Sequence, residues 1–280
     1  MTALAARALS PVLALALLVG AGAVQAASLQ PTDDPNASAM WQKVRSSLFQ
    51  GRVIAPAPPG FLSLEAPARA IDSALVPIAI RVLAPQTPER FVSKLYLIID
   101  ANPSPIAAIL GLTPESGRVE VETRVRVDDY SHVRAIAEMN DGQLYETARF
   151  VKASGGCSAP AGGDAQAALA SLGNMRVRIE GDLKGSEPVR AELLIHHPNH
   201  SGLAMDQFTR QFTPAHFVRK IDVSYGGKPV FSADVDFSIS ENPNFRFYFR
   251  PQGQAELRVL ATDTRDLRFE LVEKLGAATP

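Results

Sequence analysis

Apolar and polar residues alternate along much of the chain between residues 76 and 272, the pattern expected for strands of a half-buried sheet. In the segment 118–127, four valines at odd positions share one face, and charged residues including Arg126 share the other. The first half is predicted to contain strands at 76–83, 91–99, 118–127, 132–139 and 143–152. The second half is predicted to contain strands at 175–180, 189–195, 217–224, 230–237, 245–249, 255–261 and 267–272.

Turns and short helices separate these runs. Asn140-Asp141-Gly142 and Tyr225-Gly226-Gly227-Lys228 are hairpin signals, because glycine tolerates a positive φ. A helix ending near residue 49 is predicted from the spacing of Met40, Trp41, Val44, Leu48 and Phe49, with Asn36 or Ser38 as its cap. A second, alanine-rich helix is predicted at 165–172, with Asp164 as its cap and Gly173 at its end.

Strands separated by short turns, without the helices that parallel crossovers need, predict an all-β fold of two tandem antiparallel β-sandwiches. The predicted organisation is a signal peptide at 1–26, an N-terminal extension with a short helix at 27–50, a first sandwich at 51–153, a flexible linker at 154–173 and a second sandwich at 174–276. The high content of 21 prolines and 19 glycines suits strands punctuated by turns.

The first residues are typical of an export signal. Arg7 precedes an apolar run at 8–19, and small residues at 20–27 supply candidate cleavage sites. The apolar run is too short to span a bilayer, and the single arginine before it favours Sec-type export over the twin-arginine route. We therefore expect a periplasmic protein without a membrane anchor.

Charge and composition narrow the classes of partner. The chain has 28 Lys+Arg against 29 Asp+Glu, and 46% of its residues are hydrophobic. A near-neutral chain lacks the clustered positive charge that nucleic-acid binding needs. It also lacks a phosphate-binding glycine loop and an acidic calcium motif. We expect no cofactor, beyond a covalent sulfur adduct on its cysteine.

Cys157 is the only cysteine of the chain and lies within Ser154-Gly-Gly-Cys157-Ser-Ala-Pro-Ala-Gly-Gly163. This stretch has no large apolar residue to bury the thiol, so we expect it to be exposed. Gly155, Gly156, Gly162 and Gly163 are expected to make the loop mobile, with an end-to-end distance of about 20 Å for 153–164. A lone thiol in an oxidising compartment indicates a reactive handle or intermolecular pairing, for example a disulfide homodimer.

Other chemistry-bearing residues have simpler interpretations. His196, His197 and His200 are good metal-ligand types, but neighbouring strand residues point to opposite faces, so no metal site is predicted. Phe245, Phe247 and Phe249 alternate along one strand and are expected in the core. No catalytic residue is predicted, because no histidine is evidently placed to activate Cys157.

Several motifs resemble a known family. In the first half, Val76-Pro-Ile-Ala-Ile80, Asn102-Pro-Ser-Pro105 and Val151-Lys-Ala-Ser-Gly-Gly-Cys157 resemble the SoxY sulfur-carrier subunit. In the second, Ile195-His-His-Pro198, Ser201-Gly202, Pro214-Ala-His-Phe-Val218, Gly226-Gly-Lys-Pro-Val230 and Ser240-Glu-Asn-Pro243 resemble its partner SoxZ. On one chain, they are similar to fused SoxYZ-like carriers associated with quinoprotein dehydrogenases.

The resemblance implies an immunoglobulin-like sandwich in each half and a non-enzymatic carrier whose Cys157 holds substrate sulfur covalently. It implies partners among sulfur-oxidation enzymes, or service to a quinoprotein alcohol dehydrogenase. SoxY carries its cysteine in a Gly-Gly-Cys-Gly-Gly tail, whereas here Ser158 follows and the chain continues. Two alternatives stay open: a scaffold for a dehydrogenase in which the cysteine is incidental, and a thiol enzyme.

Overall fold

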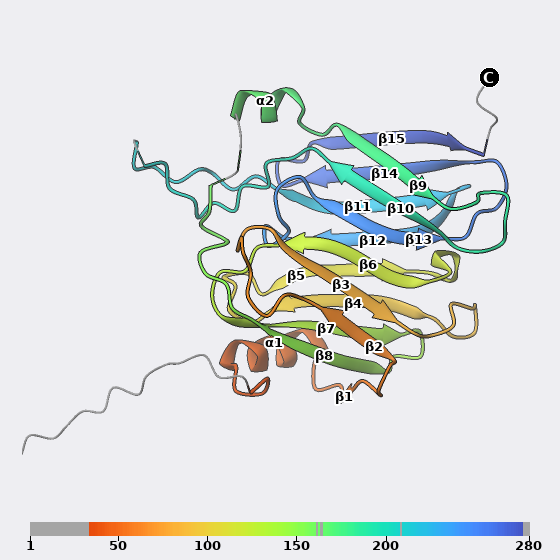
Figure 1. Ribbon diagram of the computed structural model, residues 1–280, viewed down its shortest axis with the longest axis horizontal. Coiled ribbons are helices and arrows are strands. Elements are labelled where there is room, and N and C mark those ends of the chain that lie inside the picture. The colour runs from red at the N-terminus through yellow and green to blue at the C-terminus, as the bar shows by residue number, and fades with distance from the viewer. Residues whose placement is uncertain (1–33, 161, 163–164, 208, 277–280) are drawn as a thin grey trace, which may run out of the picture. The chain divides into compact units, whose positions relative to one another are not determined.

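A computed structural model defines residues 34–160, 162, 165–207 and 209–276 of the protein (Figure 1). These residues belong to one compact unit. The signal peptide predicted at 1–26 lies outside them. None of the described helices is long and apolar enough to cross a membrane.

The described residues contain two helices, one 3₁₀ turn and fifteen strands. In chain order they are α1 (Ala39–Phe49), β1 (Ile54–Pro56), β2 (Leu62–Glu65), β3 (Val76–Val82), β4 (Val92–Ile99), β5 (Ile106–Leu112), η1 (Pro114–Ser116), β6 (Val119–Val125), β7 (Ser131–Met139), β8 (Leu144–Val151), α2 (Ala165–Ala170), β9 (Met175–Glu180), β10 (Val189–Ile195), β11 (Val218–Tyr225), β12 (Lys228–Val235), β13 (Asn244–Phe249), β14 (Ala255–Asp263) and β15 (Arg268–Leu275). The predicted all-β class is confirmed.

The strands form two sheets that each run through both halves of the chain. One has nine strands in the order β1-β8-β7-β4-β5-β12-β11-β14-β15, and the other has six in the order β2-β3-β6-β13-β10-β9. β5 pairs with β12 and β6 pairs with β13, both antiparallel. The two sandwiches are therefore joined edge to edge, which places the junction of the halves inside both sheets (Figure 1).

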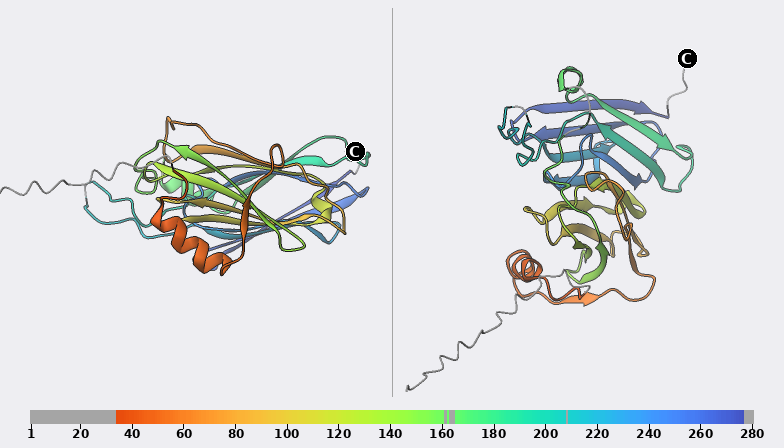
Figure 2. Two further views of the ribbon diagram at one scale, coloured as in Figure 1. Left: turned by 90° about the horizontal axis from the view of Figure 1, so that it is seen from below. Right: turned by 60° about the vertical axis from the view of Figure 1, so that its left-hand side comes forward.

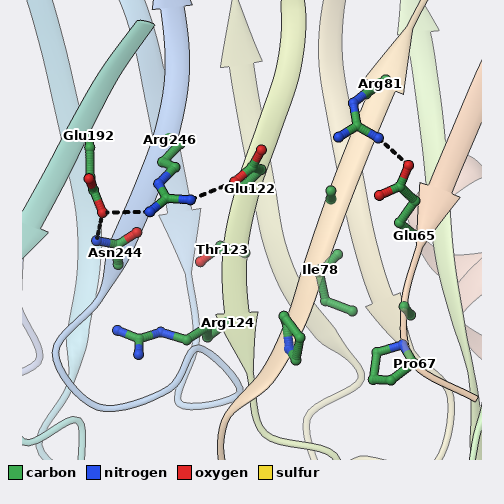
Figure 3. Close-up of a pocket in the computed structure, with 13 residues that line it drawn as sticks. Glu65, Pro67, Ile78, Arg81, Glu122, Thr123, Arg124, Glu192, Asn244 and Arg246 are labelled. Atoms are coloured by element: carbon green, nitrogen blue, oxygen red, sulfur yellow. Dashed lines mark hydrogen bonds and ion pairs between the residues drawn. The ribbon is translucent and has the colours of Figure 1, made fainter. Parts of the chain in front are cut away.

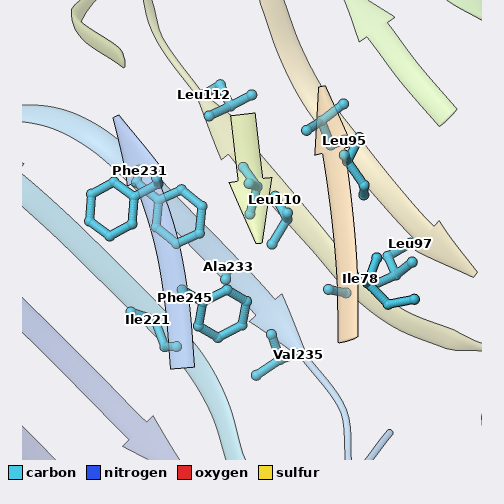
Figure 4. Close-up of a cluster of buried hydrophobic side chains, with 14 of the residues drawn as sticks. Ile78, Leu95, Leu97, Leu110, Leu112, Ile221, Phe231, Ala233, Val235 and Phe245 are labelled. Atoms are coloured by element: carbon cyan, nitrogen blue, oxygen red, sulfur yellow. The ribbon is translucent and has the colours of Figure 1, made fainter. Parts of the chain in front are cut away.

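One apolar core fills the space between the sheets across this junction. Leu110 and Leu112 of β5 lie in the same cluster as Phe231 of β12 and Phe245 of β13 (Figure 4). Phe245, Phe247 and Phe249 are fully buried, which confirms that the aromatic strand packs into the core. Because burial of apolar surface is the main favourable term in folding, the two halves stabilise one another.

Most strands fall where alternation predicts them, within one to three residues. The hairpin predicted at 140–142 joins β7 to β8, and Gly226 and Gly227 adopt positive φ values of 57° and 78° between β11 and β12. Three strands were missed: β1, β2 and β5. β5, with the sequence IAAILGL, is the centre of the nine-stranded sheet and consists only of apolar residues and one glycine, so its sequence has no alternating apolar and polar pattern to detect.

The predicted N-terminal helix is confirmed as α1, and Ser38 is its cap, accepting the Trp41 N–H at 3.1 Å. Trp41 and Phe49 pack on Tyr96 and other residues of β4 and β7 in a second apolar cluster. The helix thus covers the outer face of the nine-stranded sheet (Figure 2).

Candidate functional site

Cys157 lies in a loop that follows β8, and its thiol is 0% exposed. The prediction that this sulfur is exposed is wrong. Residues 154–160, called here the cysteine loop, are polar and small, as the sequence indicates. Other segments of the chain bury Gly156 and Cys157, whereas Ser154, Ser158 and Pro160 are exposed. The burial therefore comes from tertiary contacts rather than from apolar residues within the loop itself.

The floor of this site is the chain that leaves β6. The N–H groups of Gly155 and Gly156 donate to the carbonyls of Asp128 and Val127 at 2.7 and 3.1 Å. The Cys157 N–H donates to Asp128 Oδ1 at 3.1 Å. These hydrogen bonds fasten the loop at three successive residues.

Gly156 has a steric role in this arrangement. A Cβ atom at this position would lie 2.6 Å from the Val127 carbonyl oxygen and closer still to that of Ser73. Both obstacles are backbone atoms, which cannot rotate away. Gly156 was predicted to supply flexibility; in the closed loop, its lack of a side chain is what permits the close approach.

The remaining loop glycines differ. Gly155 adopts a positive φ of 76°, a conformation that favours glycine. Gly162 is exposed, and its N–H donates to Glu241 Oε2 at 2.7 Å. Gly163 and the predicted helix cap Asp164 lie outside the described residues. The mobility predicted for these glycines stays a prediction.

A long segment of the second half forms the cover. Residues 196–217, called here the cover loop, connect β10 to β11 and project at the left of Figure 1. Ser201 Oγ donates to the Cys157 carbonyl at 2.5 Å and accepts the Leu203 N–H. Asn199 is fully buried and bonds the carbonyls of Ile239 and Ser240 and the Val218 N–H. The cysteine thus lies between the two halves of the chain.

Arg126 is the third component of the site, and its predicted place on the exposed face of its strand is wrong. The side chain is 2% exposed. Its guanidinium donates to the Gly156 carbonyl at 3.4 Å and to the Asn199 carbonyl at 3.3 Å. The alternation of buried and exposed side chains does not continue to Arg126, because β6 ends at Val125 and the cysteine and cover loops cover Arg126.

Burial raises the pKa of Cys157 to about 12, and the negative charge of Asp128 contributes in the same direction. Arg126 acts in the opposite direction, and Asp236 adds to the increase. The closed site therefore holds a neutral thiol at physiological pH. Because the thiolate is the nucleophile, the thiol of the closed site is a poor nucleophile.

The thiol-enzyme alternative requires a base beside the sulfur. Among the described residues, no hydrogen bond joins a histidine to the Cys157 sulfur. The groups that affect its charge are acids and Arg126. In the described part of the chain, therefore, no histidine is placed to accept the proton of the Cys157 thiol, as an activated cysteine–histidine pair would require.

Histidines gather instead at the base of the cover loop. His197 and His216, at its two ends, face Asp263 at the end of β14, and all three are buried. His216 Nε2 lies 2.7 Å and His197 Nε2 3.6 Å from Asp263 Oδ2. Of the three histidines singled out in the sequence, His196, His197 and His200, only His197 joins a converging group of ligand-type residues in the described part of the chain.

Hydrogen bonding argues against a metal ion in this group. His197 Nδ1 accepts the Asn199 N–H at 3.0 Å, so a neutral His197 ring carries its proton on Nε2, the nitrogen that faces Asp263. A protonated nitrogen has no lone pair for a metal. Asp263 is already satisfied by His216 and by the N–H groups of Arg265 and Leu267. The cluster therefore anchors the cover loop.

The cluster predicts acid sensitivity. Burial and the neighbouring His216 lower the pKa of His197 to about 4, so the unfolded chain binds a proton more readily than the folded chain between pH 6.5 and 4. Stability should therefore fall as the pH falls through this range. We expect the free energy of unfolding to decrease by about 2 kcal/mol between pH 7 and 5 from this group, measured by urea denaturation. In His197→Gln, this part of the pH dependence should disappear; an unchanged pH dependence would contradict the assignment.

A separate hollow lies on the outer face of the six-stranded sheet (Figure 3). It has a volume of about 610 Å³ and spans β3, β6, β13 and β10. Ion pairs line it, including Arg246 with Glu122 and Glu192. None of its lining residues forms a hydrogen bond with the cysteine loop, so the Cys157 site does not coincide with this hollow.

Sequence reasoning found Cys157 but missed Arg126, Asp128, Asn199 and Ser201. Ser201 lies in the Ser201-Gly202 motif, to which the sequence assigns no role. One local signal was available: Asn199 lies between two histidines in a segment with no strand pattern between 196 and 217. Its contact with residues near 126 and 157 depends on the edge-to-edge joining of the halves, which local pattern does not encode.

Family models match both halves of the chain. "Sulfur oxidation protein SoxY" matches residues 45–157, and "Sulphur oxidation protein SoxZ" matches residues 177–273. The first match ends on Cys157. No curated protein sequence matches the chain.

Solved structures are similar to parts of the chain. The sulfur carrier protein SoxY of Chlorobium limicola f thiosulfatophilum is 22% identical, with a TM-score of 0.35, over 41% of this chain and 91% of that one. Superoxide reductase (neelaredoxin) of Ignicoccus hospitalis is 16% identical, with a TM-score of 0.29, over 33% of this chain and 79% of that one. Scores this low support no argument about function.

Proposed function

Because this chain belongs to the SoxYZ-like sulfur carriers, with a SoxY domain and a SoxZ domain fused in tandem, we propose that Cys157 binds a sulfur-containing intermediate covalently and presents it to partner enzymes. The observation that carries the proposal is that the SoxY match ends on the chain's single cysteine. SoxYZ carriers serve sulfur-oxidation enzymes, and the chain has the two domains of such a carrier.

The chemistry suits a cysteine. A thiolate attacks a sulfur–sulfur bond to form a mixed disulfide or a persulfide, and a second thiolate releases the bound sulfur by the same reaction. Both reactions need an accessible sulfur. The closed site described above is then the resting form, and loading requires the cysteine loop to leave Asp128 and Ser201. We expect Gly155 and Gly162 to permit this movement, because glycine has the widest range of backbone conformations.

Intact-mass measurement tests the proposal. The full-length protein and Cys157→Ser are incubated with tetrathionate, thiosulfate or polysulfide, each of which has a sulfur–sulfur bond that a thiolate can attack, and then analysed without reductant. We expect sulfur adducts on the native protein with at least one of these compounds and none on Cys157→Ser. The absence of adducts on the native protein under all three conditions would contradict the carrier function.

Location and wider partners belong to the same proposal. The positive and apolar segments at 7–19 support Sec-type export to the periplasm. The fusion of the two domains on one chain supports service to a quinoprotein alcohol dehydrogenase system. The mass of the protein recovered from the periplasm tests export, since cleavage within residues 20–27 should remove the N-terminal segment. Recovery of the uncleaved chain in the cytoplasm would contradict it.

The burial of Cys157 favours one alternative, a scaffold in which the cysteine is incidental. A free cysteine often behaves as a small apolar core residue. In that function, the two joined sandwiches bind and assemble a periplasmic dehydrogenase, or two copies pair through a disulfide. A scaffold should keep its partner-binding activity in Cys157→Ser, whereas a carrier should lose sulfur transfer entirely.

A further inference from the structure

Arg126 is a buried cation without an anionic partner. Among the residues that the structure describes, no carboxylate lies within ion-pair distance of its guanidinium, whereas other buried ions such as Arg134 and Asp100 pair at 2.7 Å. Its two hydrogen bonds, at 3.4 and 3.3 Å, are long and go to neutral carbonyls. Its Nε atom is buried and has no hydrogen-bond partner. A buried charge left in this state is unfavourable unless something neutralises it.

The position of Arg126 indicates what that partner is. The guanidinium lies between the cysteine loop and the cover loop, because it donates to Gly156 on one side and to Asn199 on the other. Glu241, Asp72 and an ionised Cys157 each attract it from beyond ion-pair distance. In the resting site, Cys157 is a neutral thiol, so the cation and the sulfur are adjacent without forming a pair.

We infer that Arg126 is the positioning residue that pairs with the negatively charged end of the group carried on Cys157 when the cysteine loop is closed. The inference rests on the proposed carrier function and adds a specific charge requirement to it. A persulfide or thiosulfonate extends beyond the sulfur atom of Cys157 and ends in a negative charge, whereas a methyl disulfide ends in a neutral group. Arg126 should stabilise a persulfide or thiosulfonate in the closed site and have little effect on a methyl disulfide.

Other charged residues around the site also act on a negative group carried by Cys157. Asp128 and Asp236 repel a negative charge on the Cys157 sulfur itself, and His200 lies in the field of Arg126. Asp128 also accepts the Cys157 N–H through Oδ1, which an asparagine can still do. Asp128→Asn therefore supplies a control of opposite sign: it should strengthen retention of an anionic group, whereas removal of the Arg126 charge should weaken it.

Two reagents load matched groups without an enzyme. Tetrathionate transfers an S–SO₃⁻ group to the Cys157 thiolate: a Cys157 Sγ–S–SO₃⁻ group forms, and thiosulfate is released as the leaving group. Methyl methanethiosulfonate transfers its CH₃S group, and methanesulfinate leaves. Each reaction forms one sulfur–sulfur bond and breaks another, so no further oxidant is needed. The two adducts differ in charge at their ends.

The experiment measures release of each adduct by dithiothreitol, in the folded full-length protein and in urea, followed by intact mass. The ratio of the rate in urea to the rate in the folded protein is the protection of the adduct. We expect Arg126→Gln to reduce protection of the anionic adduct about tenfold and that of the neutral adduct less than about twofold. Arg126→Lys should retain most of the anionic protection, because it keeps the charge.

Three outcomes distinguish the claims. Equal loss of protection for both adducts would show that Arg126 only holds the loops together, and unchanged protection of the anionic adduct would show that it does not contact the cargo; either overturns the inference and leaves the carrier function standing. If Arg126→Gln does not fold, Arg126→Lys and Asp128→Asn still test the charge requirement. Failure of both reagents to modify Cys157 in the folded native protein would contradict the carrier function as well.

Discussion

Replacing Gly156 by alanine should open the cysteine loop and increase the reactivity of Cys157 about a hundredfold, equivalent to about 3 kcal/mol. The added methyl group would lie within 3 Å of the carbonyl oxygens of Ser73 and Val127. Overpacking against backbone atoms costs about 1–3 kcal/mol, and the loop can escape this cost by leaving its site. The rate of alkylation by iodoacetamide at pH 8 measures the effect.

Gly162→Ala is the matched control, because its new methyl group would meet only the flexible side chain of Glu241, at 3.2 Å. We expect its alkylation rate to stay within about threefold of native. Circular dichroism and the thermal transition should show that Gly156→Ala keeps the fold, since the strands of both sheets do not depend on the loop. Native reactivity in a folded Gly156→Ala protein would contradict the closed loop.

Alkylation of native Cys157 should continue to accelerate at pH values at which an exposed thiol has already reached its limit. Burial raises the pKa of Cys157 to about 12 from an ordinary value of 9.0. The closed loop therefore favours the neutral thiol over the thiolate by about 4 kcal/mol more than water does. This preference is fully present below pH 9 and is lost as the pH rises toward 12, so alkali favours opening of the loop.

A pH profile of the alkylation rate tests this directly. Between pH 9 and 10.5, the native rate should rise about thirtyfold, because the thiolate population is still growing tenfold per pH unit. In Gly156→Ala, the exposed thiol should gain only about twofold over the same interval. A native profile that levels off near pH 9 would show that the thiol is already exposed in solution.

The sheets were largely predictable because their signal is local. Valines at alternate positions of β6 and turns such as 225–228 encode strands and hairpins with little reference to the rest of the chain. β5 was not predicted because its sequence, IAAILGL, has no polar residue to alternate with the apolar ones. β5 pairs with β12 at the junction, so the edge-to-edge joining of the two halves was not predicted either.

The state of Cys157 was not predictable for a related reason. Loop composition indicated exposure, since no apolar residue near Cys157 in sequence can cover it. The cover comes from Ser201 and Asn199, more than forty residues away, and from Arg126, the residue after β6. The sequence pattern singled out Cys157 as the candidate site, whereas the burial of Cys157 depends on contacts between the two joined sandwiches.

A sheltered thiol suits a carrier. An exposed thiolate in an oxidising compartment reacts with any available disulfide or oxidant, whereas a buried neutral thiol does not. Ser201 donates to the Cys157 carbonyl and Asp128 accepts the Cys157 N–H, and both hydrogen bonds can re-form after loading because neither involves the sulfur. Closure then protects the resting thiol and the loaded group alike, and a partner enzyme needs to bind only the open loop.

Peptide mapping by mass spectrometry after polysulfide treatment tests the central claim most directly, with native protein, Gly156→Ala and Cys157→Ser treated side by side. The account predicts added sulfur on the peptide that contains Cys157, faster loading in Gly156→Ala by about the same factor as its alkylation, and none in Cys157→Ser. Unmodified Cys157 in both the native protein and the opened variant would contradict it.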